Sequence, residues 1–230
     1  YITYISELLP FILCLLFIKR LVSKEKKVFF VYTILIAALV IIGFSLLYYF
    51  KSKENYFIDV RIYTVVEYSL LAYFFSLYIK SQVAKKVLFV SVVSYFIFCL
   101  YSFLIQKVPS MPFTPASVEH ILLLIFIIYY FFEFIQHVTL ESLYQRAIFW
   151  ISVAFIINSS GNFFLFLYSK NSYGDPSFNT QYTLIYSTVT ILKNVLLCVS
   201  VPIKEQPQKP VLIEDVNLDL GPIKPIDPEP

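Results

Sequence analysis

A lysine and a glutamate lie inside segments that are otherwise apolar enough to cross a lipid bilayer. Lys193 lies near the middle of the apolar segment 181–201, and Glu67 lies near the middle of the apolar segment 57–79. An ionisable side chain at that depth is costly and marks a functional site by default. The stem of Lys193 is too short to reach water easily from there. We therefore expect an internal partner for Lys193, and Glu67 is the best candidate, bound directly or through water. The alternative is that hydroxyls and water satisfy Lys193 and Glu67 separately. In that case the two residues would only fix the register of the helix bundle.

Polar side chains continue from Lys193 along one face of the same segment. Thr183, Ser187, Thr190 and Asn194 recur at spacings of four, three and four residues. On a helix this spacing places them in one stripe along an otherwise apolar cylinder. The pattern predicts that the stripe faces other helices and not lipid.

A second polar group lies in the segment 147–168, where Asn158 and Asn162 are one helical turn apart and Gly161 lies between them. Asparagines can hydrogen-bond across helices, and glycine allows helices to approach closely. The group is therefore either a packing contact or the wall of a ligand or ion cavity. The predicted intramembrane polar site consists of Glu67, Lys193, Asn194, Asn158, Asn162 and Thr190.

Three further ionisable residues lie nearer to the predicted outer face. Glu7 is about a turn inside the first apolar segment, and Glu119 and His120 lie at the start of the fifth. A histidine there can titrate near neutral pH, or it can simply lie at the membrane interface. We predict that the three residues form the outer mouth of the same cavity.

The residues that most enzymes and metal sites require are scarce. The chain has 2 histidines and 3 cysteines, and no Gly-rich phosphate loop or serine–histidine–acid set can be found. The cysteines have no metal-ligand spacing. We expect no enzyme activity, no metal site and no cofactor, and the basic loops do not resemble a nucleic-acid-binding surface.

The composition excludes a water-soluble fold. Of the 230 residues, 59% are hydrophobic and 14% are charged, and the mean hydropathy is +0.75. A soluble domain has about 25% charged residues. Partners in the membrane are therefore lipids.

Seven apolar segments are each long enough to cross a bilayer as a helix. They run continuously without the alternation of a β-barrel strand, so the predicted fold is an all-α, seven-transmembrane-helix bundle. The segments are 3–17, 28–50, 57–79, 87–105, 118–135, 147–168 and 181–201.

Basic residues set the orientation, because loops on the cytoplasmic side carry an excess of lysine and arginine. Of the 18 basic residues, twelve follow the first, third, fifth and seventh segments, and five follow the other segments. Lys193 belongs to neither group. This predicts the N-terminus outside and the C-terminus in the cytoplasm, in the plasma membrane.

The chain divides into a transmembrane domain, 1–201, and a proline-rich acidic tail, 202–230. Seven of the 12 prolines lie in the tail, and such a segment cannot bury enough apolar surface to fold alone. It is either a solvated, disordered tail or a segment, 203–230, that docks on a cytoplasmic protein through short apolar runs.

These observations favour a sensory or signal-coupling membrane protein with a polar intramembrane cavity. One alternative is a small transporter or channel that uses the Glu67–Lys193 pair. Another is a structural subunit of a larger membrane complex, in which the polar stripe faces another chain.

Overall fold

The computed structural model describes residues 2–20, 23–105, 111–135, 144–172 and 175–203. In these residues the chain forms seven α-helices and one short 3-10 turn, so the prediction of an all-helical chain with seven helices is confirmed for the described residues. The elements are α1 (Ile2–Leu16), η1 (Ile18–Arg20), α2 (Lys24–Tyr48), α3 (Lys53–Tyr78), α4 (Gln82–Ile105), α5 (Phe113–Ile135), α7 (Ala147–Ser172) and α8 (Pro176–Ser200). The tail 204–230, predicted to be disordered or bound to a partner, lies outside the described residues.

Six of the described helices, α2, α3, α4, α5, α7 and α8, are long and apolar enough to span a membrane, which indicates a multi-pass membrane protein. Helix α1 has 15 residues and is about 22 Å long at 1.5 Å per residue, shorter than the roughly 30 Å of a hydrocarbon core. The expected seven spans therefore correspond to seven helices, of which six have the length of a span.

Several helices begin four or five residues before the apolar segments predicted for them, because polar residues form their first turns. Ser23 caps α2 by accepting a hydrogen bond from the backbone N–H of Lys26 at 3.3 Å. Asp175 caps α8 by accepting from the backbone N–H of Ser177 at 2.9 Å, with Pro176 at the first helical position. Both are typical N-terminal signals that hydropathy does not detect.

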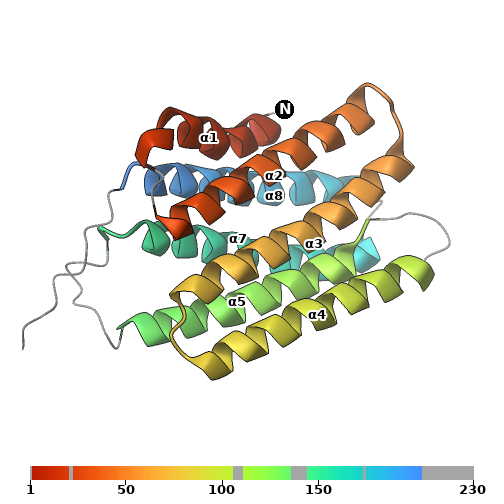
Figure 1. The fold of residues 1–230 in the computed structure, drawn as a ribbon. Helices are drawn as coiled ribbons and strands as arrows, with labels where there is room; N and C mark the ends of the chain where they lie inside the picture. Colours follow the sequence, from red (N-terminus) through yellow and green to blue (C-terminus); the bar gives the residue numbers. More distant parts are fainter. Residues whose placement is uncertain (1, 21–22, 106–110, 136–143, 173–174, 204–230) are drawn as a thin grey trace, which may run out of the picture.

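Six helices pack in a closed ring, and α4 lies outside it (Figure 1). Around the ring each helix packs on the next in the order α1, α2, α3, α5, α7, α8 and back to α1, while α4 contacts α3 and α5. Helix α4 is the least buried of the six long helices, and side chains such as Phe89 and Phe96 are exposed. The interior of the ring is therefore enclosed by six helices, and α4 packs on the outside of α3 and α5.

The helices alternate in direction, so the ring has two distinct ends (Figure 1). We call the end at which α1, α3, α5 and α8 begin the N-terminal end, and the opposite end the C-terminal end. Basic residues of the first turns of α2 and α4 lie at the C-terminal end. There the Nζ of Lys26 donates a 2.7 Å hydrogen bond to the backbone carbonyl of Ile203, just after α8.

Polar contacts between α1 and α8 close the ring. The side-chain amide of Asn194 donates to the hydroxyl of Ser6 at 3.0 Å, and the hydroxyl of Thr3 donates to that of Ser187 at 3.0 Å. The short first helix is thus attached to the polar stripe of the last. Hydrogen bonds between membrane helices typically contribute about 0.6 kcal/mol each.

The C-terminal half of the ring is filled by aromatic side chains. The ring of Phe29 lies 6.0 Å from that of Tyr32 and 6.1 Å from that of Phe74, and Tyr32 meets Phe155 edge to face at 5.9 Å. All four are buried. Aromatic contacts of this kind stabilise beyond simple burial, so this half forms a solid core.

Helices α7 and α8 approach closely where Gly161 faces Val189. A methyl group on Gly161 would lie 2.8 Å from Cγ2 and 3.0 Å from Cγ1 of Val189. A valine side chain is stiff at χ1 and cannot rotate away freely. The glycine is therefore required by the packing of these two helices.

Replacing Gly161 with alanine is expected to destabilise the bundle by about 1–3 kcal/mol, because the new methyl group forces α7 and α8 apart. Thermal unfolding in detergent micelles measures the loss as a lower melting temperature. Ser160→Ala is the matched control, since Ser160 is adjacent and exposed. In the double variant Gly161→Ala/Val189→Ala the two effects should be less than additive; full additivity would show that the Val189 contact is not the cause.

Candidate functional site

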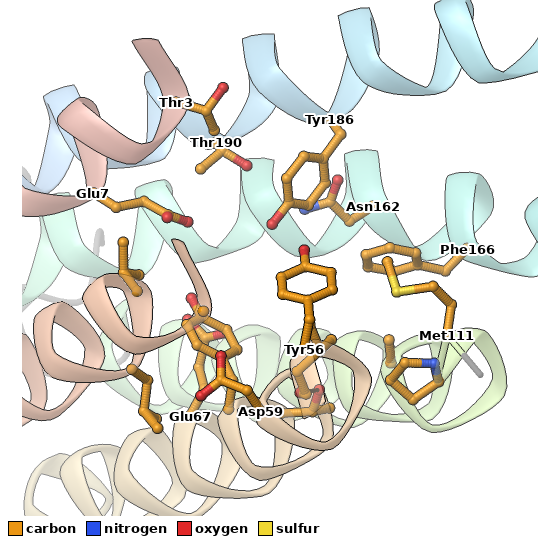
Figure 2. Close-up of a pocket in the computed structure, with 18 of the residues that line it drawn as sticks. Thr3, Glu7, Tyr56, Asp59, Glu67, Met111, Asn162, Phe166, Tyr186 and Thr190 are labelled. Atoms are coloured by element: carbon orange, nitrogen blue, oxygen red, sulfur yellow. Dashed lines mark hydrogen bonds between the residues drawn. The ribbon is translucent and has the colours of Figure 1, made fainter. Parts of the chain in front are cut away.

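A cavity of about 670 Å³ occupies the N-terminal half of the ring. All six ring helices contribute to its wall, and of the described residues none from α4 does. It extends from the exposed rim residues Tyr48 and Lys53 down to Glu67 and Lys193 near the middle of the bundle. Figure 2 shows side chains from several helices pointing into it. A volume in this range suits a small molecule.

An ion pair forms the floor of the cavity. The Nζ of Lys193 lies 3.7 Å from Oε1 of Glu67, and their side chains are 3% and 5% exposed. The hydroxyl of Tyr32 donates to the same carboxylate oxygen at 2.9 Å. Lys193 also lies 5.9 Å from the ring centroid of Phe155. Glu67 is thus held from two sides, by a cation on α8 and by a phenol on α2.

Two more carboxyl groups share this interior. Glu7 on α1 and Glu119 on α5 line the cavity, and each interacts electrostatically with both Glu67 and Lys193. Asp59 on α3 lines the cavity nearer to its rim and is buried. Around the floor, three carboxyl groups therefore face one ammonium group.

Some polar atoms of the cavity wall have no partner among the described residues. They are Oε1 of Glu119, Nδ1 of His120 and Oδ1 of Asn162, and the three side chains belong to residues that are at most 5% exposed. Asn162 uses its amide nitrogen to donate to Asn158 at 3.0 Å, which leaves its oxygen free. Buried polar groups in proteins are usually satisfied, so such atoms need an explanation.

Aromatic rings form one side of the cavity above the ion pair. His120 stacks on Phe166 with a centroid distance of 5.4 Å and an interplanar angle of 3°. Tyr186 and Tyr182 stack at 6.0 Å, and both contact Phe166 at 6.2 Å. Figure 2 shows Tyr56 of α3 and Tyr186 of α8 pointing toward one another across the cavity.

The residues predicted from the sequence are distributed as follows. Glu67, Lys193, Asn158, Asn162 and Thr190 all line the one cavity. Asn194 does not; it is buried between α8 and α1, where it bonds to Ser6.

The three residues expected at an outer mouth also line the cavity, but two of them lie deeper than expected. Glu119 is 2% and His120 is 5% exposed, since they lie about two turns inside α5 and not at its entrance. The rim is formed instead by residues such as Tyr48 and Lys53. Whether these side chains act as a functional site stays a prediction.

Sequence reasoning missed Tyr32 and Asp59. Tyr32 belongs to a segment without any charged residue in its apolar part, and nothing in the sequence indicates which of the 19 tyrosines faces a carboxylate. Asp59 lies inside the third predicted segment, so the rule that selected Glu67, an ionisable residue within an apolar segment, could also have selected Asp59. It packs over Gly43 of α2, where a side-chain Cβ would collide with its carboxylate.

No protein-family model, no curated protein and no solved structure matches this chain. The chemistry of the cavity is therefore the basis for assigning a function. In the described part of the chain, no three His, Cys, Asp or Glu side chains come close enough together to hold a metal ion. What the arrangement offers is an open, partly polar chamber with excess acid and an aromatic side.

The unequal number of acids and bases at the floor predicts unequal effects of removing them. Lys193→Met leaves Glu7, Glu67 and Glu119 without a nearby cation and is expected to cost about 3–5 kcal/mol of stability. Glu67→Gln leaves Lys193 two other carboxyl groups and keeps an acceptor for Tyr32, so it should cost less than half as much. Thermal unfolding in detergent micelles measures both.

Lys53→Met is the matched control, because it removes the same charge at the exposed rim, where ion pairs contribute at most about 1 kcal/mol. If Glu67→Gln lowers the stability as much as Lys193→Met does, the excess of acid at the floor is not the cause. The same conclusion follows if Lys53→Met and Lys193→Met lower the stability equally.

Proposed function

We propose that this chain is a ligand-sensing membrane protein, without enzyme activity, that binds a small polar molecule in the cavity of its N-terminal half. The observation that carries the proposal is the cavity itself, which is open at one end of a closed helical ring and lined by unpartnered polar atoms. A bundle whose polar residues served only for packing would bring them into contact with one another and leave no such space.

The cavity faces the outside in this proposal. Basic residues collect at the C-terminal end, which is the expected cytoplasmic end in the plasma membrane, and the cavity opens at the other. A ligand would therefore enter from outside the cell.

The closed half favours sensing over conduction. Below the ion pair, Phe29, Tyr32, Phe74 and Phe155 pack against each other and are buried, so the described residues offer no wide path to the C-terminal end. The floor joins α2, α3 and α8 through Tyr32, Glu67 and Lys193. A ligand that changes this contact can shift those helices relative to one another. The tail 203–230 would then pass the change to a cytoplasmic protein.

A transporter is the second candidate, and one observation favours it. An alternating-access carrier, in one of its states, also has a cavity that is open on one side only, and a buried ion pair can lie at the bottom of such a cavity. In that case the aromatic core of the C-terminal half would have to open in a second state.

Access to the cavity can be tested with a thiol reagent. In a variant without Cys14, Cys99 and Cys198, Asn162→Cys should react with the membrane-impermeant reagent 2-(trimethylammonium)ethyl methanethiosulfonate added outside, because water reaches the cavity. The same reagent added to inside-out vesicles should react far more slowly. Phe164→Cys is the control, since Phe164 lies on the same helix and is 69% exposed on the lipid-facing side. Equal labelling from both sides would contradict the proposal.

Binding and transport are separated by a second experiment. The purified protein is screened by thermal unfolding against metabolite-sized amines, alcohols, amides and carboxylates, and stabilising compounds are tested for uptake into proteoliposomes. Ala116→Phe fills the cavity and should weaken binding at least about 10-fold, whereas Ile128→Phe, on the exposed side of the same helix, should not.

Binding without uptake supports a sensor. Uptake that is abolished by Glu67→Gln shows instead that the protein is a transporter. Stabilisation that survives in Ala116→Phe rejects the cavity as the binding site, and a screen without any stabilising compound rejects both candidate functions.

A further inference from the structure

We infer that the ligand of this cavity is an organic cation, specifically a primary amine with an aromatic or aliphatic body. The inference rests on the proposed function, because it names the chemical class that the same cavity would bind. Three features of the cavity support an amine: the charge of its wall, its unpartnered acceptors and the position of its aromatic rings.

The charge of the wall is the first argument. Glu7, Glu67 and Glu119 share the floor region with Lys193 as the buried cation, and Lys193 is bound to Glu67. Asp59 adds a fourth carboxyl group higher in the cavity, and the other lining cation, Lys53, is exposed at the rim. A buried carboxyl group is stable in its ionised form only when a counter-charge lies nearby. A positively charged ligand supplies the missing counter-charge.

The unpartnered atoms are the second argument. Oδ1 of Asn162 accepts hydrogen bonds, Oε1 of Glu119 accepts them when its carboxyl group is ionised, and Nδ1 of His120 accepts when the proton is on Nε2. His120 stacks on Phe166, which lies one helical turn beyond Asn162 on α7, so these acceptors belong to one region. A primary ammonium group has three N–H donors. It therefore matches these three unpartnered atoms, each of which can accept a hydrogen bond.

The aromatic side of the cavity is the third argument. Phe166 contacts Phe113, His120, Tyr182 and Tyr186, and these residues line the space above the acceptors. Aromatic faces attract cations and also accommodate an apolar body.

Two alternatives fit less well. An inorganic divalent cation needs several carboxylates at one point, and the acidic side chains in the described residues are spread around the wall without forming a metal site. An anion would meet four carboxyl groups and one buried ammonium in the cavity wall.

The test uses four probes that share one phenylethyl body and differ in the polar group, added to the full chain in detergent at neutral pH. They are 2-phenylethylamine, its N,N,N-trimethyl derivative, 2-phenylethanol and 3-phenylpropionate. Calorimetry or thermal unfolding should show that the primary amine binds at least about 10-fold more tightly than the alcohol and the quaternary ammonium. The carboxylate should not bind.

Variants locate the effect. Glu119→Gln keeps the shape of the side chain and removes its charge. It should weaken the binding of the amine at least about 10-fold and change the affinity for the alcohol less than about 3-fold. Glu54→Gln removes one charge at an exposed position of α3 outside the cavity and is the matched control. If Glu119→Gln does not fold, the comparison of the four probes on the unaltered chain still decides the question.

The outcomes separate this inference from the proposed function. If the alcohol or the carboxylate binds as tightly as the amine, and Ala116→Phe abolishes that binding, the cavity is a ligand site but the amine assignment is wrong. Equal binding of the primary and quaternary ammonium rejects the role of the unpartnered acceptors. Equal effects of Glu119→Gln and Glu54→Gln reject direct contact with Glu119. If no probe binds and Asn162→Cys is not labelled from outside, the proposed function itself fails.

Discussion

A charge inside a bilayer must be surrounded by protein, and this constraint explains the form of the molecule. Lys193 lies about two turns before the end of α8, where it could not face lipid without a large penalty. Glu67 on α3 neutralises it, and Tyr32 on α2 holds the carboxylate in place. Because α8 and α3 lie on opposite sides of the ring, the pair can form only if helices on both sides close around it. The ion pair and the closed ring therefore depend on each other.

The same constraint separates the helices into two kinds. Those with polar or ionisable residues in their middle turns, such as α3, α5, α7 and α8, direct these residues toward the interior. Helix α4 has no charged residue and no asparagine or glutamine deep in its span and remains outside, with large apolar side chains exposed. The two halves of the ring also differ. Aromatic packing in the C-terminal half holds the helices together, and this leaves the N-terminal half able to keep an open cavity.

The sequence was sufficient for the helices and for much of the interior, because hydropathy detects apolar segments and helical spacing detects a polar face. Glu67 and Lys193 could be paired because few ionisable residues lie so deep. The order of helices around the ring could not be predicted, since similar apolar surfaces do not specify neighbours. For that reason Asn194 was placed in the cavity although it joins α1 to α8, and Tyr32 was missed. The volume of the cavity depends on how all six helices pack together, so the sequence of any single helix does not predict it.

An excess of acid next to a buried ion pair also suggests how binding would be transmitted. A ligand can shift an equilibrium between two forms of the bundle only by the difference in its affinity for them. An ammonium group near Glu119 takes up part of the negative field that Lys193 otherwise feels, so the attraction between Lys193 and its surroundings changes when the cavity fills. The contact that responds is the one that joins α8 to α3 and, through Tyr32, to α2. Since Tyr32 also packs on Phe29 and Phe155, a change at the floor would reach the aromatic core of the opposite half.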